Sequence, residues 1–204
     1  ACFTCVISTM FVLMVAYATS VMRFKMRKPF MNIAMIIGLF PSFMSMIAVY
    51  YILRALNLAD GAMIRVALII VFSAGSGAGF YVAKGFFDTI SKSLDEAAII
   101  DGATRWNVFT KITVPLSKPI IVYTILTSFM GPWVDFIFGK VICRADAQYY
   151  TVSIGLWKML EKEYIDSWYT CFAAGAVVVS IPIAILFLMT QKFYVEGMTG
   201  AVKG

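Results

Sequence analysis

Long apolar runs constrain the fold of this chain more than any other feature of its sequence. Five stretches have about the length, roughly 20 residues, that a helix needs to cross a lipid bilayer. We place these spans at residues 1–22, 30–53, 62–83, 120–138 and 169–189. Hydrophobic residues make up 61% of the chain, which is more than the core of one soluble domain can bury. The sequence therefore predicts an all-α, polytopic membrane protein whose residues 1–204 form a single transmembrane domain.

Two of the expected spans contain residues that bear on helix shape and packing. Pro41 lies in the middle of the second span, where a kink is tolerated if neighbouring helices satisfy the freed carbonyl. The third span carries SAGSGAG, in which Gly75 and Gly79 form a GxxxG pattern that lets two helices approach closely. A nucleotide-binding loop is the alternative, but the chain contains no GxxxxGK[ST] pattern. We therefore expect helix packing here, and ATP bound elsewhere.

The basic residues predict which segments face the cytoplasm. Residues 23–28, the polar block at about 84–119 and the C-terminal tail together hold eleven Lys and Arg, whereas the opposite segments hold six. Cytoplasmic loops carry the excess of Lys and Arg, so we expect the block and the C-terminus in the cytoplasm. The net charge of +6 is interpreted as this insertion bias, and we expect no nucleic-acid partner.

The composition also limits the chemistry open to the chain. It has no His, the commonest general base and metal ligand. Its cysteines are Cys2, Cys5, Cys143 and Cys171, and Cys2 and Cys5 form a CxxC inside an apolar run. We expect membrane-embedded thiols, with redox or metal chemistry as the alternative. The sequence therefore predicts a protein that is not an enzyme and binds no cofactor or metal itself.

The polar block between the third and fourth spans predicts two short helices joined by a hinge. Ser93–Glu96 has the pattern of a capping box at a helix start, and Gly102 suits the left-handed conformation that ends a helix. Thr104 is a candidate cap for a second helix, which we expect to end at Pro115 and Pro119. Taken alone, these residues are equally explained by local helix capping and propensity.

The block also resembles a known motif. From Glu96 it gives E-A-A, three residues, Gly102, nine residues, Ile112, one residue, Val114 and Pro115. This is similar to the EAA motif of the membrane subunits of ABC importers, EAA-x3-G-x9-I-x-L-P. Six of the seven fixed positions match, and Val replaces Leu at position 114.

The resemblance implies a type I importer permease fold and a set of partners. In that family the first short helix is a coupling helix that docks in a cleft of the ATP-binding subunit. The role carries to Glu96, Ala97, Ala98 and Gly102. The implied partners are a second, homologous permease subunit, an ATPase dimer that holds ATP and Mg, and an extracellular or periplasmic sugar-binding protein. The implied location is the bacterial cytoplasmic membrane.

Three further stretches resemble the permeases of maltose and maltodextrin importers, which implies an oligosaccharide substrate. They are FPSFMSMIAVYYILRALNL at 40–58, GPWVDFIFGKVI at 131–142 and GMTGAVKG at 197–204. In that family the subunit has six spans and the polar outer segment, here 156–168, contacts the binding protein. We therefore expect one more N-terminal span in the full chain.

Asp135 and Trp133 are the remaining candidates, as parts of a translocation path. An acid near a span interior marks a polar path or a partner base, and a Trp there stacks on a sugar ring or anchors the helix at the interface. Two other functions stay open on the residues alone. An ion-coupled secondary transporter requires buried carboxylates or internal repeats, and a membrane scaffold would use the polar block only to recruit a partner.

Overall fold

The computed structural model describes residues 1–39, 42–75, 79–144 and 146–201, and these fold into helices with no strand. The all-α prediction is therefore confirmed for the described residues. In chain order the elements are α1 (Cys2–Val21), α2 (Arg27–Gly38), α3 (Ser42–Ala55), α4 (Met63–Gly75), α5 (Gly79–Phe87), α6 (Lys92–Ile100), α7 (Arg105–Val108), the π-helix η2 (Phe109–Thr113), α8 (Val114–Leu116), α9 (Lys118–Val134), α10 (Ile137–Cys143), the 3-10 helix η3 (Ala147–Tyr149), α11 (Val152–Lys158) and α12 (Ile165–Ala201).

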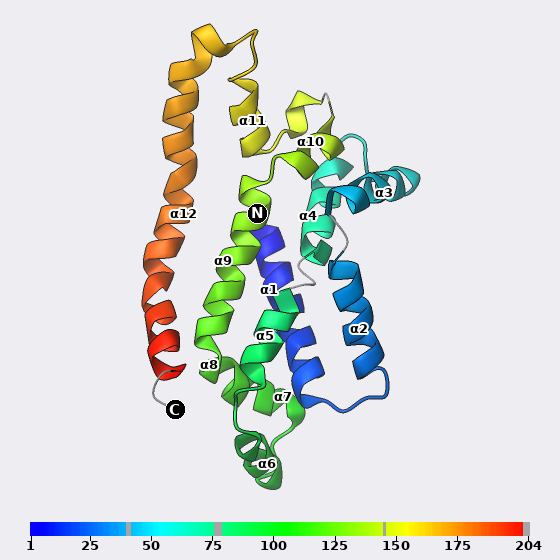
Figure 1. Cartoon of the computed structure of the whole chain (residues 1–204), viewed down its shortest axis with the longest axis vertical. Coiled ribbons are helices and arrows are strands. Elements are labelled where there is room, and N and C mark those ends of the chain that lie inside the picture. Colours follow the sequence, from blue (N-terminus) through cyan, green and yellow to red (C-terminus); the bar gives the residue numbers. More distant parts are fainter. Residues whose placement is uncertain (40–41, 76–78, 145, 202–204) are drawn as a thin grey trace.

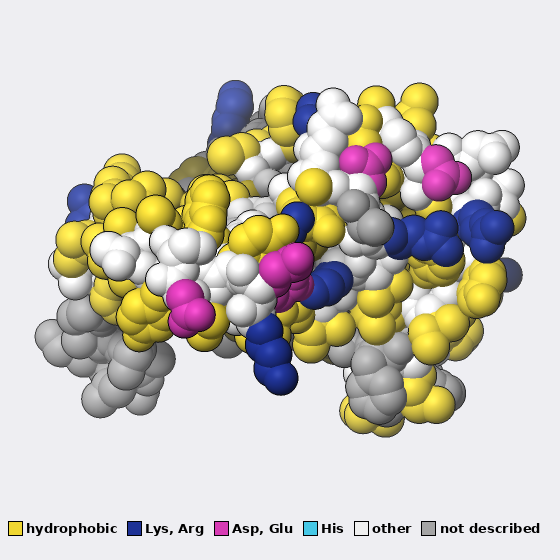
Figure 2. Space-filling model, turned by 90° about the horizontal axis from the view of Figure 1, so that it is seen from above, with side chains coloured by type: hydrophobic (Ala, Val, Ile, Leu, Met, Phe, Trp, Pro, Cys, Tyr) yellow, Lys and Arg dark blue, Asp and Glu magenta, His cyan; other side chains and the backbone are white. Residues whose placement is uncertain are grey.

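The helices form an elongated bundle with two distinct ends (Figure 1). We call the end that holds the α1–α2 loop, α6, α7 and the end of α12 the lower end, and the end that holds α10 and α11 the upper end. Residues 23–28, the polar block from the end of α5 to α8 and the end of α12 thus lie at the lower end. Figure 2 looks down on the upper end, where basic and acidic side chains are interspersed among apolar ones.

Three helical segments are long and apolar enough to cross a membrane: Cys2–Val21, Met63–Phe87 and Ile165–Phe193. The second of these runs through residues 76–78, which lie outside the described residues. A fourth candidate is the bent pair formed by residues 105–116 and 118–134, whose two arms meet at 84°. The first, third, fourth and fifth expected spans therefore have counterparts in the structure.

The second expected span is not one straight helix. It divides into α2, with 12 residues, and α3, with 14. Figure 1 shows α2 running along the bundle and α3 running across it at the upper end. Neither helix has the length of about 20 residues that a straight crossing requires. The expected span at 30–53 is therefore not seen as one helix of crossing length, and Pro41, where we expected a kink, lies outside the described residues.

A lower core joins α1 to the helices around it. Ala16 on α1 and Ala83 on α5 are fully buried, and small residues here let the two backbones come close. Gly79 lies in the same contact, since a Cβ placed there would meet Val12 Cγ2 at 3.7 Å, an ordinary van der Waals distance. Close packing that requires the glycines stays a prediction, because residues 76–78 of the glycine-rich segment lie outside the described residues. Tyr17 and Phe109 extend the core to η2, with ring centroids 4.7 Å apart.

An upper core joins α3, α4, α10 and α11. Ile142 and Ile154 are among its most buried side chains, at 0% and 2% exposure. Gly139 permits this packing because a Cβ there would come within 3.2 Å of Ile154 Cδ1. Two cation–π contacts lie over the core, from Arg65 to the Tyr149 ring and from Arg144 to the Tyr50 ring. The two cores place separate packed bodies at the two ends of the bundle.

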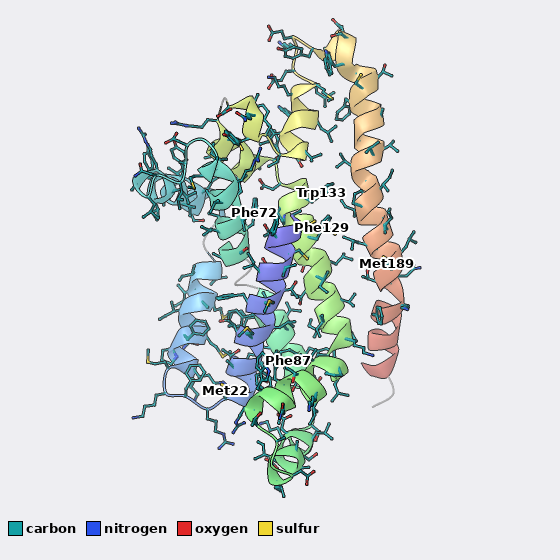
Figure 3. All side chains as sticks on the ribbon, turned by 180° about the vertical axis from the view of Figure 1, so that it is seen from behind. Met22, Phe72, Phe87, Phe129, Trp133 and Met189 are labelled. Carbon is teal, nitrogen blue, oxygen red and sulfur yellow. The ribbon has the colours of Figure 1, made fainter. Side chains whose placement is uncertain are left out.

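The long helix α12 lies beside α9 and leaves most of its surface uncovered. None of the residues in its most apolar window is buried inside the protein. Met189, labelled in Figure 3 on the lower half of α12, is 64% exposed. An apolar helix this exposed requires lipid or another apolar partner as its surroundings.

Candidate docking site at the lower end

Helix α6 stands outside the bundle and buries none of its side chains. Leu94 and Ile100 are 46% and 85% exposed. Ala97 lies between them in sequence and is also exposed, whereas Ala98 is half-buried. A short helix that shows apolar side chains and a small residue to solvent offers a surface for close docking of another protein. Sequence reasoning singled out the two alanines but missed Leu94 and Ile100, which are six residues apart and so do not share one face of a helix.

The start of α6 differs from the expected capping box. The helix begins at Lys92, so Ser91 occupies the N-cap position, and its hydroxyl lies 2.7 Å from the Ser93 hydroxyl. Ser93 is already helical, and Glu96 lies in the middle of the helix. The capping box is therefore wrong, because the helix begins at Lys92, two residues before the start that an N-cap at Ser93 requires. Glu96 instead faces a cavity, as described below.

The end of α6 agrees with the predicted hinge. Gly102 has φ +85°, the left-handed region that favours glycine. The Gly102 N–H donates to the Ile99 carbonyl at 3.0 Å, and the Ala103 N–H donates to the Ala98 carbonyl at 2.9 Å. This pair of hydrogen bonds is the Schellman motif that closes a helix C-terminus. Thr104 then caps α7 by accepting a hydrogen bond from the Asn107 N–H at 3.2 Å. The predicted helix, glycine hinge and helix are confirmed.

The second helix of the block ends at Leu116, between the two prolines at which we expected it to end. Pro115 does not end it but lies in α8, directly after the π-helix η2. A π-helix widens the turn by one residue, and Pro115 has no N–H to donate. The break comes at Ser117, which is fully buried, and Pro119 lies in the first turn of α9. The segment from α7 to α8 thus lies across the bundle at 84° to α9.

Helix α7 and η2 are anchored to the spans, unlike α6. Val108 and Phe109 are buried, at 1% and 9% exposure. The Tyr17 hydroxyl on α1 donates to the Arg105 carbonyl at 3.5 Å, and its ring packs on Phe109. A displacement of α6 would therefore pass through Gly102 to an element that packs against α1.

A polar cavity of about 480 Å³ separates α6 from the ends of the spans. Its lining includes three acidic residues and four basic ones: Asp88, Asp95, Glu96, Arg23, Arg27, Lys92 and Arg105. Charged side chains of both signs and this much space leave room for α6 to shift relative to the bundle. This cavity was not predictable from the sequence, because its lining comes from three separate segments.

The carboxylates of Asp88 and Asp95, both in this cavity, have opposite surroundings. Burial raises the pKa of Asp88, but hydrogen bonds from Lys84 and Ser20 and the charges of Lys84 and Arg27 outweigh it, so the pKa lies below the ordinary value. Burial raises the pKa of Asp95; Arg105 opposes this and Glu96 adds to it, so the pKa lies above the ordinary value. Asp88 thus stabilises the end of α5, whereas the Asp95 charge is poorly accommodated.

Asp135 and Trp133 hold local structure at the upper half of α9. Asp135 Oδ2 accepts a hydrogen bond from the Gly139 N–H at 2.7 Å and so caps the start of α10. Trp133 Nε1 donates to the Val179 carbonyl of α12 at 3.1 Å, and its ring stacks on Phe129 at 5.3 Å. Figure 3 shows the two rings next to each other. Both polar groups therefore have structural partners, which the sequence did not reveal. A role of either residue in a translocation path stays a prediction.

Comparison with known proteins decides the family. The family described as binding-protein-dependent transport system inner membrane component matches residues 9–198. The chain belongs to this family. The permease is 36% identical to the galactooligosaccharides transport system permease protein of Bacillus subtilis, over 99% of this chain and 70% of that protein. It is 34% identical to a maltose/maltodextrin transport system permease protein of Vibrio vulnificus, over 93% of this chain and 64% of that protein.

Further relatives agree with this assignment. The permease is 32% identical to the maltodextrin transport system permease protein of Streptococcus pneumoniae, over 98% of this chain and 71% of that protein. It thus spans about two thirds of the length of these relatives. Its fold is similar to a chain in a crystal structure of a bacterial ABC transporter involved in the import of the acidic polysaccharide alginate. The TM-score is 0.76 at 26% identity, over 94% of this chain and 70% of that chain.

Proposed function

We propose that this permease is one of two membrane subunits of an ATP-driven importer of oligosaccharides. The observation that carries the proposal is α6, an exposed helix with Ala97 and Ala98 at its centre. It is linked by the Gly102 hinge to an element that packs against the spans. This geometry suits the transfer of force from a soluble partner into the membrane. An importer whose energy came from an ion gradient would have no need of such a helix.

Each residue of the motif has a distinct part in the proposed coupling. Ala97 and Ala98 let the cleft of an ATPase subunit approach the helix backbone, and Leu94 and Ile100 add apolar contact area. Glu96 faces the charged cavity behind α6, where it would hold the helix orientation. Gly102 lets α6 turn relative to α7 without strain.

The proposed partners are a second homologous permease subunit, an ATPase dimer with bound ATP and Mg, and an extracellular or periplasmic sugar-binding protein. The exposed apolar surface of α12 supports an assembly in which a membrane subunit or lipid covers it. The upper end, with α10 and α11, is the proposed contact for the binding protein. ATP-driven closure of the ATPases moves α6, and the spans alternate between inward-facing and outward-facing arrangements.

The proposed location is the bacterial cytoplasmic membrane, with the lower end and the C-terminus in the cytoplasm. The basic residues gathered at the lower end support this orientation.

The proposed substrate is a neutral oligosaccharide of the maltodextrin class. The names of the relatives include galactooligosaccharides as well as maltose and maltodextrin. Uptake of labelled maltotriose, in competition with an unlabelled galactooligosaccharide, tests the choice. If unlabelled galactooligosaccharide competes more strongly than unlabelled maltotriose, galactooligosaccharides become the favoured substrate class.

The coupling role is tested by Gly102→Val in the assembled transporter. The left-handed φ strains any β-branched residue, so we expect the ratio of sugar imported to ATP hydrolysed to fall several-fold. Gly61→Val is the matched control, because Gly61 has φ +57° and equally open surroundings but lies near the upper end. Normal coupling in Gly102→Val, or equal losses in both variants, would contradict the proposal.

A further inference from the structure

The loop between α1 and α2 and the first turn of α2 carry a cluster of positive charge, in which Arg23 and Arg27 also line the charged cavity behind α6 and the two lysines do not. Its members, which we call the basic loop, are Arg23, Lys25, Arg27 and Lys28. Three of the four side chains are exposed and Arg27 is half-buried. In the part of the chain that the structure describes, none of the four takes part in an ion pair. Together with Phe24 they line a shallow hollow of about 490 Å³.

The N-terminus of α2 adds to the positive charge of the basic loop and so favours a bound anion. The N-terminus of a helix carries a partial positive charge that favours anions. The first turn of α2 instead begins with Arg27 and Lys28, contains no acidic residue, and has no side-chain cap. The positive charges of the side chains and of the helix end therefore add rather than cancel. An anion in the hollow would relieve both.

Apolar side chains accompany the charges and show which anion fits. Met22, Phe24, Met26 and Phe30 are 40%, 44%, 63% and 42% exposed. The first three alternate with the basic residues at the point where the apolar helix α1 ends, which is headgroup depth for a helix that spans a bilayer. Figure 3 labels Met22 at this point, with long nitrogen-tipped side chains extending outward from the loop. Basic groups beside membrane-inserting apolar groups recognise an anionic lipid surface.

We propose that the basic loop is a binding site for the phosphodiester headgroups of anionic lipids in the adjacent leaflet. The apolar side chains enter the acyl region while the Arg and Lys groups contact the headgroup phosphates, with Arg able to do so through two parallel hydrogen bonds. An acidic protein surface would match the charges but would not account for four exposed apolar side chains beside them. Only the identity of that leaflet as the cytoplasmic one rests on the proposed orientation.

The test measures lipid retention by the assembled transporter in nanodiscs. Spin-labelled phosphatidylglycerol and phosphatidylcholine report the motionally restricted lipid at the protein surface. The variant is Arg23→Gln with Lys25→Gln, and we expect the preference for phosphatidylglycerol to fall about tenfold or more. The control is Lys118→Gln with Lys192→Gln, which removes the same charge from α9 and α12, and it should leave the preference unchanged.

Further measurements keep the proposal testable if the variant fails to insert, since these charges also direct insertion. In the unchanged protein the preference should fall as salt is raised, and millimolar inorganic phosphate should not abolish it. A preference that is independent of salt, or equal losses in variant and control, would overturn the proposal. Full displacement by inorganic phosphate would overturn it in favour of a small-anion site. A preference that appears only after the ATPase subunits are removed from the transporter would overturn it in favour of a protein contact.

Discussion

Single polar groups at the lower end act through their immediate partners. Asp88 receives hydrogen bonds from Ser20 on α1 and Lys84 on α5, so it connects two helices at the point where they leave the core. Asp95, across the same cavity, has a negative neighbour in Glu96 and is partly buried. An aspartate thus stabilises the end of α5, whereas the aspartate in α6 lowers stability because its charge is partly desolvated.

Removing the charge of each carboxylate should therefore change the stability of the protein in opposite directions. Asp88→Asn should lower the stability of the assembled protein by about 1 kcal/mol at pH 7, a value kept small because the side chain is 45% exposed. Asp95→Asn should leave stability unchanged or raise it slightly, because the amide removes a poorly solvated charge. Thermal unfolding of the two variants and the parent protein measures both.

The pH dependence gives a second check on these signs. The pKa of Asp88 is lowered, so its contribution is present above the ordinary Asp value and is lost as pH falls through the lowered pKa. The pKa of Asp95 is raised, so its penalty relaxes as pH falls toward that raised pKa. The advantage of Asp95→Asn should shrink between pH 7 and the acid range. A loss of stability in Asp95→Asn as large as in Asp88→Asn would contradict this interpretation.

Trp133 predicts how firmly α12 is attached. Trp133→Phe keeps the stacking on Phe129 but removes the hydrogen bond to the Val179 carbonyl, at a cost of about 1 kcal/mol. Hydrogen exchange should therefore quicken in α12 near Val179. Trp157→Phe is the control, since the Trp157 ring packs on Phe136 at the upper end. Unchanged exchange in Trp133→Phe would mean that the ring alone holds the helix.

At the scale of the elements, α6 combines exposure with a C-terminus closed by hydrogen bonds at Gly102 and Ala103. This predicts that bulk on its surface blocks docking without unfolding the bundle. Ala97→Trp should reduce co-purification of the ATPase subunits at least several-fold while insertion stays normal. Ala147→Trp is the matched control, because Ala147 is an exposed alanine in η3 at the upper end. Full assembly with Ala97→Trp would exclude this face as the docking surface.

The elements also show where sequence reasoning succeeds and fails. The Gly102 hinge and the Thr104 cap were predictable because backbone conformation and capping depend on local residues. The π-helix and the break at Ser117 were not, since burial of Phe109 and Thr113 against other helices decides how that segment turns. The hydrogen bond from the Gly139 N–H to Asp135 was not predictable either, since the turn after α9 brings the two residues together, and the path role of Asp135 stays a prediction. Tertiary partners were thus the missing information.

At the scale of the whole molecule, the two ends of the bundle should lie on opposite sides of the membrane. Single cysteines replacing Lys25, Lys92 or Glu163, in a cysteine-free background, report this. A membrane-impermeant maleimide should label Glu163→Cys in intact cells, and the other two only after permeabilisation. Labelling of Lys92→Cys from outside would invert the proposed orientation and place α6 out of reach of a cytoplasmic ATPase.

The right angle between the α7–α8 segment and α9 has a mechanical consequence. The corner lies at Ser117, whose side chain is fully buried, so neighbouring atoms brace it on every side. A corner held in this way keeps the angle between the two helices fixed. A displacement of the α7–α8 segment in the membrane plane therefore becomes a tilt of α9. Trp133 joins the upper end of α9 to α12. A small displacement of α7–α8 at one membrane surface would therefore move α9 and α12 together at the opposite surface.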